Sequence, residues 1–217
     1  MNIYKKLLIG VFTLCFLTAC SQNSQTTTDA QNIHPNSNSK ILIVYFASGE
    51  NSEVDVASSA SVTKSNGKDV GIVHALADKI HNEVKGDMFS IQTSVKYPQN
   101  NDDVVDYAKK EQDAQTRPTL TSHMNHLEDY DIIFIGYPNW WYDLPMVMYS
   151  FFDEYDFSGK TVIPFCTHRG SGFSDTIKTI QELEPKAHVI TDGFTISADH
   201  VDEADKDVKT WIRNLGF

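Results

Sequence analysis

An unbroken apolar segment at residues 132–136, Ile-Ile-Phe-Ile-Gly, constrains the fold of this chain more than any other part of the sequence. It is short and rich in β-branched residues, and no polar residue alternates with the apolar ones, as expected of a strand in a parallel sheet with helices on both faces. The segment runs directly into a turn that carries Pro138 and two adjacent tryptophans, Trp140 and Trp141. Ligands of open α/β sheets bind beyond the carboxyl ends of the strands, so these indole rings could form the wall of a site for a planar ligand. The alternative is a core tryptophan beside one that lies over a loop.

Similar strands recur along the chain and alternate with segments of helical periodicity. Apolar segments predict strands at residues 40–46, 88–91, 132–136, 161–166 and from 188 onward. Apolar periodicity and capping residues predict helices at residues 71–86, 102–115, 144–154, 172–183 and 202–215, of which the second is an exposed surface helix. The alternation predicts one α/β domain, in which a doubly wound sheet of five parallel strands carries helices on both faces.

Residues 49–70 interrupt this alternation between the first strand and its helix. Two short segments flank Asn66 and Gly67, and Asn-Gly is the strongest short signal for a β-hairpin. The sequence therefore predicts a hairpin insertion, which either forms a flap over a site or decorates the surface.

The N-terminal part of the chain differs in composition from the rest. Two lysines precede a short apolar segment at residues 7–17, too short to span a bilayer, and small residues lead to Cys20. This pattern resembles a bacterial lipoprotein signal, which predicts a signal peptide at residues 1–19, a lipid on Cys20 and a location outside the cytoplasmic membrane. An ordinary signal peptide with a chance cysteine is the alternative. Residues 20–39 are polar and predict a flexible tether to a domain at residues 40–217.

Composition narrows the class of partner. The formal net charge of -11 opposes binding to nucleic acid and to anionic lipid. We therefore expect the acyl chain alone to attach the protein to the membrane. An acidic surface either steers a basic partner protein or has no specific role.

Cys166 is the one cysteine of the predicted domain, so we expect a small core residue and no disulfide. His123 and His126 lack further ligands at metal-binding spacing, and Ser171 lacks the flanking pattern of a hydrolase nucleophile, which predicts no metal site and no catalytic side chain.

The loops after the third and fourth predicted strands carry motifs of a known family. They contain Pro138-x-Trp140-Trp141 and, at residues 166–173, the motif Cys-Thr-x-x-Gly-Ser-Gly-Phe. With these motifs the chain resembles the flavodoxin-like FMN-binding proteins over residues 40–217. The resemblance implies a five-stranded sheet in the order 2-1-3-4-5, a noncovalent FMN, and electron transfer with redox partner proteins or a small electron acceptor. Two alternatives remain open: an FMN-dependent quinone or NAD(P)H oxidoreductase, and a surface binding module that has lost FMN.

The resemblance also implies which residues contact the cofactor. They fall into three groups: Ser48, Gly71, Ile72 and Val73 for the phosphate, Pro138, Asn139, Trp140 and Trp141 for the isoalloxazine, and Thr167, His168, Gly170 and Gly172 for its pyrimidine edge. One tryptophan would stack on the isoalloxazine, and the other would serve as core. Ile72 and Val73 stand where the family often has Asn and Thr, so backbone N–H groups at the helix start would bind the phosphate, helped by hydroxyl groups from Ser58, Ser59 or Ser61.

His168 and Arg169 occupy positions where the family often has small residues. A cation near the pyrimidine edge would favour the anionic reduced flavin and raise its midpoint potential. The alternative is that both side chains simply point to water.

Overall fold

The computed structural model describes residues 33, 35–36 and 38–217. The predicted signal peptide, Cys20 and most of the predicted tether lie outside these residues. Within the described part of the chain, no helix is both long enough and apolar enough to cross a membrane.

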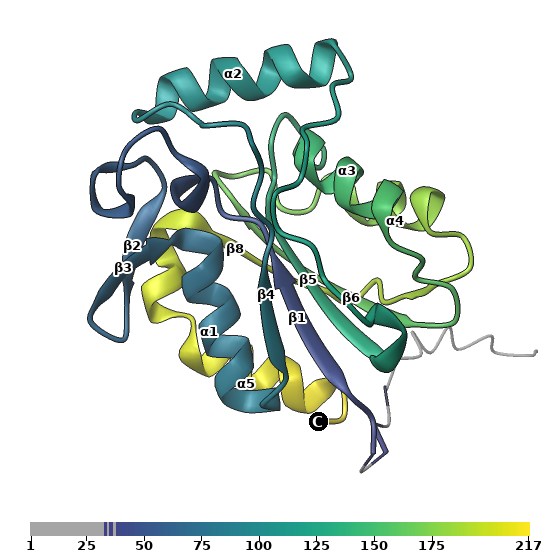
Figure 1. Ribbon diagram of the computed structural model, residues 1–217. Coiled ribbons are helices and arrows are strands. Elements are labelled where there is room, and N and C mark those ends of the chain that lie inside the picture. The colour runs from purple at the N-terminus through teal and green to yellow at the C-terminus, as the bar shows by residue number, and fades with distance from the viewer. Residues whose placement is uncertain (1–32, 34, 37) are drawn as a thin grey trace, which may run out of the picture.

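A parallel sheet forms the centre of the molecule (Figure 1). Its strands are β1 (Ile41–Tyr45), β4 (Asp87–Ser90), β5 (Ile132–Pro138), β6 (Thr161–His168), β7 (His188–Val189) and β8 (Phe194–Ser197). The hydrogen-bonded order is β4-β1-β5-β6-β7, and β8 also pairs with β6. This order confirms the flavodoxin-like sheet, with β7 and β8 together in the fifth position.

Two short strands occupy the fifth position because the neighbouring strand contains a proline. β7 pairs with β6 as far as Val162, and pairing resumes where Phe165 meets Phe194. Between these points lies Pro164, which has no N–H group to donate to a ladder. Gly193 approaches its carbonyl oxygen so closely that a Cβ atom on the glycine would lie 2.5 Å away. The chain therefore leaves the ladder beside Pro164 and rejoins it at β8.

Helices cover both faces of the sheet (Figure 1). α1 (Ile72–Val84) and α5 (Asp205–Asn214) pack together on one face, and α3 (Met146–Glu154) and α4 (Thr176–Leu183) cover the other. α2 (Asn101–Asp113) contacts α3 at the end of the sheet where the strands finish. Successive residues of β5 point alternately into the two cores, and this two-sided burial explains the unbroken apolar segment at residues 132–136.

Two helices begin later than the sequence predicts. α4 begins at Thr176 instead of residue 172, because Gly170, Gly172 and Ser174 have φ angles of +108°, +59° and +50°, which a right-handed helix does not allow. α5 begins at Asp205, after a separate 3₁₀ helix at Ala198–Glu203. The loop after β6 is consequently longer than expected.

An antiparallel hairpin of β2 (Val62–Ser65) and β3 (Lys68–Gly71) lies between β1 and α1. Its turn residues Asn66 and Gly67 have φ angles of +50° and +78°, as a two-residue hairpin turn requires. β3 runs directly into α1, and the Ser65 hydroxyl donates to the Asp78 carboxylate of that helix. The hairpin is thus fixed against the start of α1.

Candidate functional site

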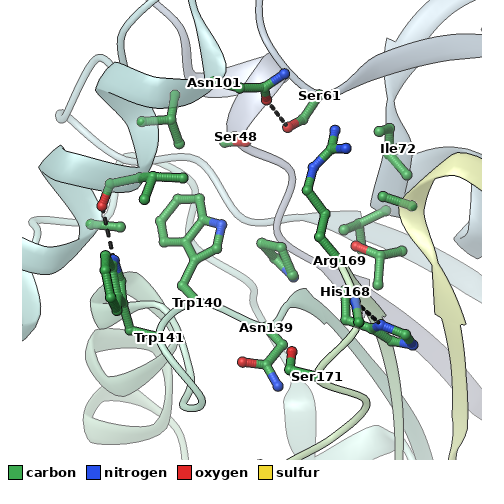
Figure 2. Close-up of a pocket in the computed structure, with 18 of the residues that line it drawn as sticks. Ser48, Ser61, Ile72, Asn101, Asn139, Trp140, Trp141, His168, Arg169 and Ser171 are labelled. Carbon is green, nitrogen blue, oxygen red and sulfur yellow. Dashed lines mark hydrogen bonds between the residues drawn. The ribbon is translucent and has the colours of Figure 1, made fainter.

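A cavity of about 780 Å³ opens where β1, β5 and β6 end (Figure 2). This volume lies within the range of small-molecule and cofactor sites. The cavity brings together ten of the twelve residues that the resemblance assigns to a cofactor: Ser48, Ile72, Val73, Pro138, Asn139, Trp140, Trp141, Thr167, His168 and Gly170. Gly71 and Gly172 do not line it. The role of the ten residues as cofactor contacts stays a prediction, but their convergence follows from the sheet topology.

The turn after β5 holds Trp140 in the cavity wall and turns Trp141 outward. Trp140 is half-buried and packs edge-on against Phe46 and Tyr97, with ring centroids 5.7 and 5.3 Å away. Trp141 is 42% exposed, and its Nε1 donates to the carbonyl oxygen of Val105 in α2 at 2.9 Å. Trp140 packs against the hydrophobic core without being fully buried, and both indoles line the cavity. Which of the two would stack on an isoalloxazine stays a prediction.

The backbone of this turn is strained. Trp140 and Asp143 exchange backbone hydrogen bonds of 3.1 and 3.0 Å, and between them Trp141 and Tyr142 have φ angles of +52° and +67°. A left-handed conformation at a bulky residue costs about 1–2 kcal/mol, and such strain concentrates at functional sites. The Asp143 carboxylate anchors the turn, because it accepts a hydrogen bond of 2.7 Å from the hydroxyl group of Tyr149 in α3.

Asn139 joins this turn to the loop after β6 and presents one unpaired acceptor. Its backbone N–H donates to the Thr167 carbonyl at 2.8 Å, and its Nδ2 donates to the Gly172 carbonyl at 2.7 Å. Its Oδ1 has no hydrogen-bond partner and is alone in this among the buried side-chain nitrogen and oxygen atoms of the described residues. An unpaired buried acceptor costs about 1–3 kcal/mol. A ligand with an N–H or O–H donor would remove that cost.

The loop after β6 presents one neutral and one charged side chain to the cavity. The Gly170 N–H donates to Nδ1 of His168 at 2.9 Å, and burial lowers the pKa of His168 below its ordinary value. Burial therefore favours the neutral form of His168 at pH 7, and the positive charge near a pyrimidine edge stays a prediction that falls mainly to Arg169. Arg169 remains as the cation of this loop, and its Nη1 pairs with the Asp199 carboxylate at 3.2 Å.

Groups of the protein itself already occupy the N-terminus of α1. The N–H of Gly71 donates to Oε1 of Glu50 at 3.2 Å, and the N–H of Ile72 donates to the Ser61 carbonyl at 2.9 Å. Two of the backbone donors predicted to bind a phosphate are therefore not free. Gly71 instead permits close packing, since a Cβ atom there would lie 2.4 Å from the Cβ of Ala47.

A partly buried charged cluster lies behind this helix start. Nδ1 of His74 contacts Glu50 at 2.5 Å, its Nε2 lies 3.5 Å from Asp78, and Tyr45 stacks on its ring with centroids 4.7 Å apart. Burial by itself lowers the pKa of His74, but hydrogen bonds with Asp78 and Glu50 outweigh burial and raise the pKa to about 9. His74 is consequently a cation at pH 7 that offsets part of the charge of the two carboxylates.

The contribution of α2 to the cavity was not predicted from the sequence. One side of the cavity is lined by Asn101, Asp102, Val104, Val105 and Ala108, although the helix is predicted as an ordinary surface helix. Val105 is 46% exposed, and this apolar residue in a polar helix was the available signal. Of the hairpin insertion, Ser61 reaches the cavity, so the part of the insertion that lines the cavity is the segment before β2.

Comparisons with known proteins agree on the family. A family model described as Flavodoxin matches residues 66–215. Two solved structures, each described as a "putative flavoprotein", come from Bacteroides eggerthii DSM 20697 and Bacteroides uniformis ATCC 8492. The first is 23% identical over 83% of this chain and 99% of its own, with a TM-score of 0.61, and the second is 27% identical over 81% and 99%, with a TM-score of 0.60.

A third solved structure is a flavoprotein in complex with FMN from Lactobacillus acidophilus NCFM. It is 20% identical over 76% of this chain and 97% of its own, with a TM-score of 0.52, and supports the fold. No curated protein sequence matches this chain.

Proposed function

Because the chain belongs to the flavodoxin family, we propose that it binds FMN noncovalently in the cavity at the ends of β1, β5 and β6 and transfers electrons. FMN supplies the one- or two-electron chemistry when bound, while the protein binds it, orients it and sets its potential. The observation that carries the proposal is a half-buried indole, Trp140, in the wall of the same cavity as the polar residues Asn139 and Thr167.

The lining residues fit a planar heteroaromatic ring. Stacking of such a ring on an aromatic side chain contributes about 1–3 kcal/mol, and the packing of Phe46 and Tyr97 fixes Trp140 before a ligand arrives. The pyrimidine ring of an isoalloxazine carries hydrogen-bond donors and acceptors, and the polar residues Asn139, Thr167 and Ser171 line the same cavity. Gly170 has no Cβ and a φ of +108°, so the backbone of the loop after β6 can approach a ring edge closely.

An absorbance titration tests this proposal directly. The purified protein is mixed with FMN, excess cofactor is removed, and the visible spectrum is recorded. We expect a retained flavin with shifted bands, followed by stepwise reduction in a redox titration. Protein that stays colourless after incubation with excess FMN would overturn the proposal and favour a binding module that has lost the cofactor.

An FMN-dependent quinone or NAD(P)H oxidoreductase is the second candidate, favoured by the exposed rim of the cavity. Tyr142 is 67% exposed and Trp141 is 42% exposed, so a small planar acceptor can reach the lining without displacing a core side chain. Rapid oxidation of NAD(P)H by a quinone in the absence of a partner protein would favour this enzyme. Slow turnover with small acceptors, together with fast reduction by a protein donor, would favour the electron carrier.

The proposed site of action is the outer side of the cytoplasmic membrane, where a lipid on Cys20 would tether the domain. The support is the sequence pattern of a positive start, a short apolar segment and a cysteine after small residues. We expect the chain in the membrane fraction of its host cell and the Cys20→Ala variant outside that fraction. An equal distribution of the two proteins would contradict the tether.

A further inference from the structure

The part of the cavity nearest α1 offers few side chains that could hold a phosphate. Ala47, Ile72 and Val73 line it with apolar surface, and Ser48 contributes one hydroxyl group. The N–H groups of Gly71 and Ile72 are paired with Glu50 and with the Ser61 carbonyl, which leaves the N–H groups of Val73 and His74 as the donors of the first turn. A phosphate bound at this end would therefore meet few donors, and a cation from another part of the chain would strengthen its binding.

One side chain meets that need. Among the described residues that line the cavity, Arg169 carries the only full positive charge, because burial favours the neutral form of His168 at pH 7. Figure 2 shows that the Arg169 side chain runs from the loop after β6 toward the part of the cavity lined by Ser61 and Ile72. Ser61 donates to Oδ1 of Asn101 at 3.2 Å, and both residues line the same cavity as Arg169.

The present partner of Arg169 does not hold it strongly. Asp199 and Arg169 have side chains 68% and 56% exposed, and a solvent-exposed pair of this kind contributes about 0–1 kcal/mol. A guanidinium forms two parallel charge-assisted hydrogen bonds with a phosphate, which are roughly twice as strong as neutral ones. A phosphate in the cavity would therefore compete successfully with Asp199 for the guanidinium of Arg169.

We propose that Arg169 binds the phosphate of FMN in this chain. It would replace the polar phosphate contacts that are absent because Ile72 and Val73 stand where the family often has Asn and Thr. The inference rests on the proposed function. In this proposal Arg169 contacts the phosphate and not the pyrimidine edge. The loop after β6 would then contact both the isoalloxazine ring and the phosphate of FMN. Arg169 thereby determines the preference for FMN over riboflavin, which has the same ring and no phosphate.

Binding of the two flavins to Arg169→Gln tests the inference. Dissociation constants for FMN and riboflavin are measured by quenching of flavin fluorescence, at low salt and at 0.5 M salt. Loss of a charge-assisted contact predicts FMN binding about 10- to 100-fold weaker and a smaller salt dependence, with riboflavin binding within about twofold of the original protein. Asp199→Asn frees the guanidinium and should tighten FMN binding by about two- to fivefold.

Lys40→Gln is the matched control, because Lys40 forms a similar exposed pair with Asp129 at the start of β1, away from the cavity. It should leave both dissociation constants unchanged. Equal losses for FMN and riboflavin in Arg169→Gln would overturn the inference, since they would reflect a disturbed loop. FMN binding weakened by Asp199→Asn as much as by Arg169→Gln would overturn it too. If the unsubstituted protein binds neither flavin, the proposed function itself fails.

Discussion

Removal of the charge on His74 should make the stability of the protein less dependent on pH. In the folded state hydrogen bonds with Asp78 and Glu50 outweigh burial and raise the pKa of His74 from 6.5 to about 9. The folded state therefore binds the proton more tightly than the unfolded chain. The resulting stabilisation is complete below pH 6.5 and is lost as the pH rises through 9.

The magnitude follows from the size of the shift. Each pKa unit corresponds to 1.36 kcal/mol, so the shift would contribute about 3.4 kcal/mol if the site were fully shielded from solvent. Because His74 is only half-buried, solvent screening reduces this to about 2 kcal/mol. With an m-value of about 2 kcal/mol/M, that loss displaces the midpoint of urea unfolding by about 1 M.

The assay compares urea unfolding of the original protein and of His74→Gln between pH 6 and pH 9.5. The stability difference should be about 2 kcal/mol at pH 6 and close to zero at pH 9.5. Burial raises the pKa of Cys166 to about 12, so the unfolded thiol ionises first and also lowers stability at high pH. Both proteins contain Cys166, so the difference between them isolates His74. A stability difference that stays constant across this pH range would refute the reasoning.

Four further substitutions have defined outcomes. Trp140→Leu should weaken FMN binding about tenfold in a fluorescence titration and Trp141→Leu by less than threefold, because only Trp140 is held against the core. Gly136→Ala should lower the free energy of urea unfolding by about 1–3 kcal/mol, since its Cβ would lie 2.1 Å from the buried ring of Phe165. Burial raises the pKa of Glu111 to about 7, so its ionisation costs stability, and Glu111→Gln should raise the unfolding free energy by about 1–2 kcal/mol at pH 8.5 but not at pH 5.

Each of these expectations has a contrary result. Equal losses of FMN affinity in the two tryptophan variants would mean that Trp140 has no special role in stacking. An unchanged unfolding midpoint for Gly136→Ala would mean that the Phe165 ring can move aside. The same effect of Glu111→Gln at both pH values would mean that ionisation of the carboxyl group is not the cause.

The sheet could be predicted because the sequence of each central strand by itself indicates that the strand is buried. Ile133 and Ile135 enter one core, and Ile132 and Phe134 enter the other, so four consecutive apolar residues indicate burial on both faces. The division of the fifth strand could not be predicted in this way. It depends on Pro164, which is distant in sequence and meets Gly193 only in the folded sheet.

The candidate site could be predicted only as far as topology determines it. Parallel strands deliver the loops after β1, β5 and β6 to one edge, which brings Ser48, Trp140 and Thr167 to one cavity. No sequence pattern predicted that Glu50 pairs with the N-terminus of α1. Glu50 lies in a four-residue 3₁₀ helix without periodicity, and nothing in the sequence indicates that it reaches Gly71 across the start of the hairpin.

The charged cluster at the start of α1 affects both the stability of the fold and the preference for FMN over riboflavin. With His74 protonated, the formal charges of Glu50, His74 and Asp78 sum to -1, and deprotonation changes the sum to -2 beside Ile72. A phosphate held by Arg169 would then meet greater repulsion at the same end of the cavity. FMN affinity should therefore fall between pH 8 and pH 9.5 while riboflavin affinity does not, and His74→Gln should bind FMN more weakly at pH 7 with little further change on raising the pH. A fall shared by both flavins would instead mean that deprotonation loosens the fold around the ring.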